Sequence, residues 1–211
     1  MATRKYDQVL RAEAAQETRR RILAAVGQRL REVPTEQPSL EQVARLANVS
    51  RSTIYADFGS RAGLFDAFVV DLWKHTGLGE LSRAVASDDA REHLREGIAA
   101  ASRMKGRDLA IYRVLHAMDR LDPESAGSAV RHMEQDRRAG MESLAAHLER
   151  DGVLREDLSA EQAADALWVL TSFESLDLLV TGRGLTVDEA IATLVTMAER
   201  TVCRPPELTR S

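Results

Sequence analysis

Five side chains between positions 51 and 61 carry groups that can bind a polyanion or read the edges of bases. Arg51, Ser52 and Thr53 are consecutive, Tyr55 follows, and Arg61 comes six residues later. A guanidinium can donate two parallel hydrogen bonds to O6 and N7 of guanine, or to two phosphate oxygens. Hydroxyl groups can donate to phosphate oxygens. The chemistry that these residue types could support is therefore recognition of nucleic acid.

Two short helices are expected to position these side chains. Ser39 and Gln42 form a capping box, in which the serine hydroxyl accepts from the amide of Gln42 while the glutamine side chain reaches back. Asn48 stands where the chain must turn, and asparagine tolerates a positive φ at modest cost. Ser50 then caps a second helix that ends at about Asp57. The spacing predicts a helix-turn-helix, whose second helix would fit the major groove.

A longer helix must support this pair, which is too small to be stable alone. Apolar residues recur at three- and four-residue steps between about Ala15 and Glu32, which predicts a helix there. Pro34 and Pro38 would end it. The predicted buried residues of the three-helix unit are Ile22, Val26 and Leu30 on the first helix and Val43, Ala44, Val49 and Ile54 on the short pair.

Charge is divided unevenly along the chain. Residues 1–60 hold 10 Lys/Arg against 7 Asp/Glu, and the remaining 151 residues hold 19 against 26. An ordinary solvated surface would explain the small positive excess of the first segment. The triplet Arg19, Arg20 and Arg21 precedes the helix-turn-helix, however, where it could meet a polyanion.

A set of residue types at fixed spacing covers about fifty residues in the N-terminal quarter of the chain. These positions are Thr18-Arg19, Ile22-Leu23, Ser39-Leu40, Val43-Ala44, Ala47-Asn48-Val49-Ser50, Thr53-Ile54-Tyr55, Phe58, Ser60-Arg61 and Leu64-Phe65. At these residues the chain resembles the TetR family of bacterial transcriptional regulators. The spacing of so many positions is a more specific signal than any tripeptide among them.

This resemblance implies an architecture and a function. The fold would be all-α, with a three-helix DNA-binding domain at residues 1–60 and a helical effector-binding and dimerisation domain at residues 61–211. A homodimer would bind a palindromic operator in double-stranded DNA. A small-molecule effector would release the DNA, so the protein is expected to be a repressor.

The resemblance also assigns roles to individual residues. Arg51 would read a base, and Ser52 and Thr53 would face bases or nearby phosphates. The family's phosphate contacts fall on four positions of this chain, Thr18, Ser39, Tyr55 and Arg61. Ser39 and Thr18 are expected at helix starts, where hydroxyl and amide groups together suit a phosphate oxygen.

Three positions depart from the family pattern. Asn48 replaces the usual glycine of the turn, and residues 33–38 replace a shorter glycine-aromatic link. Asp57 stands where histidine or tyrosine is common, and its carboxylate would repel phosphate unless it turned toward Arg51 or Arg61. Asp57 therefore keeps a second interpretation open, a helical protein-interaction module whose helix-turn-helix no longer binds DNA.

Helical periodicity continues through the rest of the chain, and no strand is predicted. Helices are expected over 61–75, 88–103, 107–120 and 123–150, with Gly77 and Gly79 ending the first. Capping boxes at Ser159 and Thr186 begin two more helices, separated by residues 182–184. The first has apolar groups on more than one face, so the pair is expected to form a four-helix dimer interface. Burial of both faces inside one monomer is the alternative. The interface residues proposed are Phe173, Leu178, Ile191 and Leu194.

The effector pocket is expected among helices that surround the cavity in the family. Aromatic, histidine and methionine side chains on these helices could line it. Ordinary core packing explains each of them at least as well. The candidates are Tyr112, His116, Met133, Met141 and Trp168.

Several classes of function have no support in the sequence. An enzyme is not expected, since the chain has no serine elbow, phosphate loop or paired-carboxylate motif. The five histidines show no metal-ligand spacing, so neither metal nor cofactor is expected. No apolar run approaches the roughly 20 residues that span a bilayer. The single cysteine, Cys203, and the lack of a leader at Met1 favour a soluble protein of a reducing cytoplasm.

Overall fold

The computed structural model describes residues 2–33 and 36–205, and these residues are helical with connecting turns. No strand occurs in these two ranges, where the only bridge pairs Leu154 with Cys203. The all-α prediction is confirmed. The chain divides into two compact units, one formed by residues 1–72 and 110–131 and the other by residues 73–109 and 132–211. The predicted boundary after residue 60 stays a prediction.

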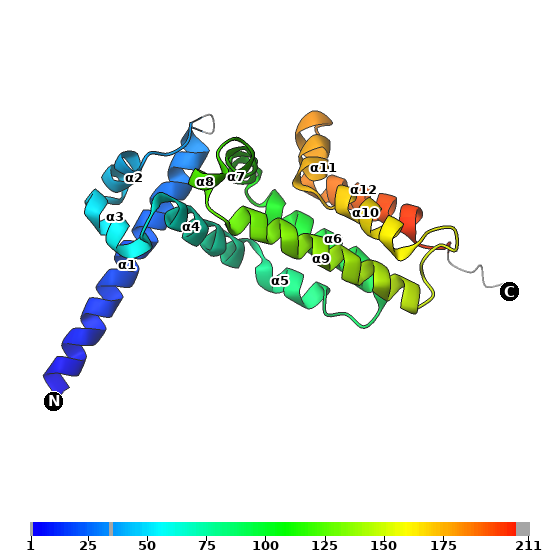
Figure 1. The fold of residues 1–211 in the computed structure, drawn as a ribbon, viewed down its shortest axis with the longest axis horizontal. Coiled ribbons are helices and arrows are strands. Elements are labelled where there is room, and N and C mark those ends of the chain that lie inside the picture. The colour runs from blue at the N-terminus through cyan, green and yellow to red at the C-terminus, as the bar shows by residue number, and fades with distance from the viewer. Residues whose placement is uncertain (1, 34–35, 206–211) are drawn as a thin grey trace. The chain divides into compact units, whose positions relative to one another are not determined.

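The first unit contains the predicted three-helix arrangement. Helix α1 (Ala2–Glu32) packs against α2 (Leu40–Ala47), which packs against α3 (Arg51–Phe58), and α4 (Arg61–Thr76) follows (Figure 1). Ile22, Val26 and Leu30 of α1 are completely buried, as is Ile54 of α3. Burial of these side chains stabilises two helices that are too short to persist alone.

The start of the first helix was predicted wrongly. Helix α1 begins at Ala2, not near Ala15, and residues 10–17 are exposed. Alanine, glutamate, glutamine and arginine dominate this segment and favour a helix by intrinsic propensity. An exposed segment has no apolar stripe, and periodicity alone therefore does not detect it. The predicted end at Glu32 is confirmed, and Pro34 lies outside the described residues.

The predicted helix over 123–150 is interrupted. After α7 (Leu109–Leu121), the structure has α8 (Pro123–Ala126) and then α9 (Ala129–Arg150), with Gly127 between them at φ +84°. The Asp66 carboxylate of α4 accepts from the amides of Ser128 and Ala129 at 2.6 and 2.7 Å. This tertiary cap satisfies amide groups at the start of α9. A carboxylate 62 residues before the first capped amide gives no local signal of the break.

The second unit is a helical layer around an apolar core. Helix α6 (Ala90–Gly106) packs against α5 (Leu78–Ala84) and α12 (Val187–Val202), and α12 lies beside α10 (Ala160–Leu170) (Figure 1). Helix α5 was not predicted, because the glycines at 77 and 79 suggested a loop. Fully buried leucines from four helices form the centre of the core, namely Leu94, Leu144, Leu148, Leu167 and Leu194.

Both capping boxes of this unit are confirmed. Ser159 begins α10 and Thr186 begins α12, each with the reciprocal side-chain bonds expected. The helix after Ser159 is broken, however, and continues as α11 (Phe173–Asp177) and a π-helical turn, η1 (Leu178–Gly182). Ser172 caps α11 by accepting from the amide of Ser175 at 3.1 Å.

Two cations stabilise the break after α10. Lys105 is 3% exposed, and its Nζ donates to the Thr171 carbonyl at 2.7 Å. Arg137 donates to the Trp168 carbonyl at 2.6 Å and lies 3.5 Å above the Trp168 ring. Positive charge at a helix C-terminus is favourable. Burial, and secondarily the Arg137 charge, lowers the pKa of Lys105 to about 8.

None of the helices in the described ranges combines the length and apolar character needed to cross a bilayer.

Candidate nucleic-acid interface

A tight turn sets the angle between α2 and α3. Asn48 has φ 52° and ψ 52°, the left-handed conformation that the sequence predicted. The Ser39 capping box is also confirmed, with Oγ accepting from the amide of Gln42 at 3.2 Å and the Ser39 amide donating back at 2.9 Å. Val43 and Ile54 are buried in the angle, and Val49 is half-buried. The helix-turn-helix therefore has a fixed geometry.

The outer face of α3 is exposed and polar. Arg51, Ser52 and Tyr55 are exposed. Thr53 is half-buried, and its hydroxyl lies 2.8 Å from Ser50 Oγ at the helix start. The Ser52 hydroxyl also lies 2.7 Å from Ser50 Oγ. The Arg51 guanidinium and the Tyr55 ring are the longest groups on this face. These two residues can reach furthest toward a bound partner.

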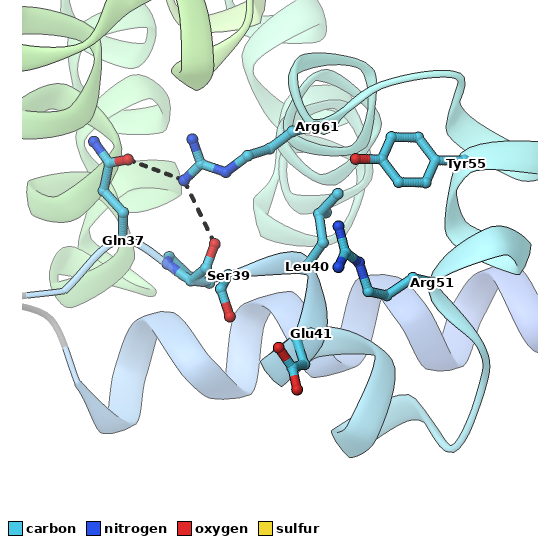
Figure 2. A pocket seen from close by; sticks show the side chains of 8 residues that line it. Gln37, Ser39, Leu40, Glu41, Arg51, Tyr55 and Arg61 are labelled. Carbon is cyan, nitrogen blue, oxygen red and sulfur yellow. Dashed lines mark hydrogen bonds between the residues drawn. The ribbon is translucent and has the colours of Figure 1, made fainter.

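A notch of about 420 Å³ lies beside this face, where the starts of α2 and α4 meet α3 (Figure 2). The Arg51 and Arg61 guanidinium groups and the Tyr55 hydroxyl turn into the notch, and Ser39 lies at its edge (Figure 2). Arg61 donates to Gln37 Oε1 at 3.0 Å and to the Pro38 carbonyl at 3.4 Å. These two bonds hold its charge in place, and no carboxylate pairs with it among the residues that the structure describes. A phosphate oxygen would find two guanidinium groups and hydroxyl donors here.

The notch also contains one negative group, Glu41, in the first turn of α2. Figure 2 shows its carboxylate directed away from Arg61 and Tyr55. The positive charges of Arg51 and Arg61 outnumber it, so the notch favours an anion.

Arg19 has a role that the sequence did not reveal. Its guanidinium lies 4.3 Å from the Phe58 ring centroid and donates to the Asp57 carbonyl at 3.3 Å. Arg19 thereby caps the C-terminal turn of α3 from α1, 38 residues away. The Asp57 residue remains exposed beside this contact.

Thr18 does not lie at a helix start. It is in the interior of α1, where its amide belongs to a continuing helix, and its hydroxyl accepts weakly from Arg21 at 3.5 Å. The prediction of a helix start at Thr18 is wrong for the reason given above, the exposed extension of α1. Its contact with phosphate stays a prediction that rests on the side chain alone.

The five predicted pocket residues fall in both units. Tyr112 is buried and His116 half-buried in the first unit; Met133, Met141 and Trp168 are half-buried in the second. Met141 and Trp168 both line a hollow of about 250 Å³ between α9 and α10. Their role in binding an effector stays a prediction.

The predicted interface residues differ in exposure. Leu178 is 68% exposed, whereas Phe173, Ile191 and Leu194 are buried within the second unit. Val169 of α10 is also exposed. Leu178 and Val169 are therefore accessible to a second copy of the chain. Phe173, Ile191 and Leu194 instead pack in the core of the unit.

Comparison with known proteins agrees with the geometry. Residues 22–68 match the family model of bacterial regulatory proteins of the tetR family. No curated protein sequence is significantly similar to the chain. A TetR transcription regulator from Haloarcula marismortui has the same fold, with a TM-score of 0.69 at 16% identity over 89% of this chain and 99% of that one. A TetR family regulator from Marinobacter aquaeolei gives 0.66 at 16% identity over 92% and 100%.

A third similar structure contains a ligand. It is a transcriptional regulator from Saccharomonospora viridis in complex with choline, with a TM-score of 0.66 at 19% identity over 90% of this chain and 100% of that one. The match of the family model spans the end of α1, all of α2 and α3, and the first half of α4, and it therefore includes the turn at Asn48 and the notch. Residues 22–68 therefore form a helix-turn-helix domain of the tetR family of bacterial regulatory proteins, and the chain has the fold of the TetR regulators named above.

Proposed function

We propose that the protein is a repressor that binds a palindromic operator as a homodimer and is released by a small-molecule effector. The observation that carries this proposal is the exposed polar face of α3 beside a positively charged notch. Arg51 is exposed at the rim of the notch, from which its side chain can turn to read a base, while Tyr55 and Arg61 bind phosphate in the notch. Contacts to phosphate would fix the register in which Arg51 meets a base.

Dimerisation follows from the small size of the recognition element. One helix of eight residues reads few base pairs, so specificity requires a second copy. Two copies related by a two-fold axis would read an inverted repeat, with half-site centres about 10 bp apart or a multiple of this. The exposed Leu178 and Val169 support an apolar contact between copies.

Release by an effector is supported by the second unit. Met141 and Trp168 line a hollow, and the similar protein from Saccharomonospora viridis binds choline. An effector that binds better to the DNA-free arrangement need supply only about 1–3 kcal/mol of coupling.

Selection from a random pool of DNA duplexes tests the proposal. The full chain is unfolded, freed of retained ligand, refolded, and checked for helical content before selection at low salt. We expect enrichment of an inverted repeat. A folded protein that enriches no sequence would overturn the proposal and favour the protein-interaction module, in which the exposed Asp57 keeps phosphate away.

A further inference from the structure

A strongly basic hollow lies in the second unit, on the side of the core where α6 begins and α12 ends. Its volume is about 620 Å³, and five arginines line it together with Glu199, Cys203 and Pro205. The arginines are Arg91, Arg95, Arg155, Arg200 and Arg204. The segment from residue 61 onward has more acidic than basic residues, so this concentration of positive charge is against the local trend.

The backbone around the hollow is tied together. The Arg155 amide donates to the Val202 carbonyl at 3.0 Å, and the Arg204 amide donates to the Val153 carbonyl at 2.9 Å. These bonds join the turn after α9 to the end of α12, next to the bridge between Leu154 and Cys203. The rim is therefore ordered by main-chain bonds, which do not depend on a ligand.

Carboxylates balance only part of the positive charge. Arg95 pairs with Glu199 at 2.7 Å, Arg155 pairs with Asp157, and Arg204 lies 3.9 Å from Glu156. The remaining two arginines, at positions 91 and 200, form no ion pair within the described ranges. Arg91 instead donates to the Arg204 carbonyl at 2.6 Å, which fixes its position and leaves its charge uncompensated.

One further bond and a buried thiol complete the walls of the hollow. The Nε of Arg204 donates to the Leu154 carbonyl at 3.1 Å. Cys203 is buried in the wall at 4% exposure, and burial raises the pKa of its thiol. The thiol is thus a neutral group in the wall, and the binding capacity lies in the arginines.

We propose that this hollow binds a small molecule with two or more phosphoryl groups, independently of the DNA-binding notch. Guanidinium groups match phosphoryl oxygens with paired N–H donors, and several of them converge here. The volume exceeds that of a single phosphate and lies in the range of small-molecule sites. A monovalent anion would leave much of this charge uncompensated, so a multivalent anion is the better fit.

Calorimetric titration with inorganic pyrophosphate tests this proposal, at constant ionic strength and with sulfate as a comparison. The full chain should bind one pyrophosphate more tightly than it binds sulfate, and the affinity should fall as salt is raised. Arg200→Gln should weaken binding by about tenfold, and the double variant Arg95→Gln/Arg200→Gln should weaken it further. Arg200 is exposed, so its replacement should leave the fold intact.

Two control variants locate the site. Arg138→Gln removes an exposed arginine that pairs with Glu142 on α9, away from the hollow, and should keep the wild-type affinity. Arg61→Ala removes a guanidinium from the DNA-binding notch and should also keep it. Equal affinity for pyrophosphate in the wild type and in the double variant would overturn the proposal, as would loss of binding in Arg61→Ala alone.

Discussion

Individual residues carry the chemistry of the interface, and their neighbours decide what they can do. Arg51 is exposed on α3 and keeps its guanidinium available, whereas Arg61 is anchored by Gln37 and the Pro38 carbonyl. An anchored guanidinium is suited to a phosphate, whose position is nearly independent of sequence. The exposed Arg51 side chain can turn from the notch toward a base edge.

Asn48 gives a test of the turn at the level of one residue. Its left-handed conformation is strained for most residues but not for glycine. Asn48→Gly should therefore change the free energy of unfolding by only a few tenths of a kcal/mol. Asn48→Ala should lower it by about 1 kcal/mol. Urea unfolding of both variants checks this, and equal stability of the two would show that the turn conformation is not what Asn48 provides.

The sequence predicted the local part of the interface and missed its long-range part. Ser39, Asn48 and Ser50 act on amides or torsions within a few residues, and such signals are visible in the sequence. Arg19 acts on α3 from α1, and nothing near either helix indicates that contact. The Arg61 bonds to the loop before α2 are hidden for the same reason.

At the scale of helices, local signals again predict the starts, whereas tertiary contacts decide the breaks. Those with capping boxes or prolines at their starts begin where predicted, because the signal lies in the capping residues themselves. The break between α8 and α9 depends on Asp66, and the break after α10 depends on Lys105 and Arg137. Tertiary partners make these breaks favourable, so they could not be read from periodicity.

The buried Lys105 makes stability depend on pH in a predictable direction. Its pKa is lowered from 10.5 to about 8 in the folded state, so the unfolded chain binds the proton more tightly between these values. The free energy of unfolding should therefore rise from about pH 8 to about pH 10.5, by on the order of 3 kcal/mol. Denaturant unfolding at several pH values measures this rise.

Two lysine variants separate this effect from other titrations. Lys105→Met should remove the rise, because no group with a lowered pKa remains at that position. Lys74→Met replaces an exposed lysine and should keep the wild-type profile. The explanation is wrong if the free energy of unfolding changes with pH in the same way in the wild type and in Lys105→Met.

At the scale of the whole molecule, the proposed function requires two copies of the chain. Leu178→Glu places a charge on the exposed apolar group of η1 and should weaken dimerisation by about tenfold to a hundredfold, since each leucine occurs twice in a symmetric interface. The affinity of the protein for the inverted repeat should fall as dimerisation weakens. Sedimentation measures the first effect and DNA titration the second.

Leu121→Glu is the matched control for this prediction. Leu121 ends α7 and is 84% exposed, but it lies outside the predicted interface. This variant should sediment and bind DNA as the wild type does. A monomeric wild type, or equal dissociation in both variants, would contradict the proposed role of Leu178.

The most direct test of the account compares Arg51→Ala with Arg61→Ala on every single-base variant of the selected half-site. Arg51→Ala should abolish discrimination at one base position, worth about 1–3 kcal/mol, and preserve it elsewhere. Arg61→Ala should weaken binding to all sequences alike. It should also reduce the dependence of the DNA affinity on salt concentration by the amount expected for about one phosphate contact. If both variants instead weaken every sequence equally, α3 does not read bases through Arg51 and the central claim fails.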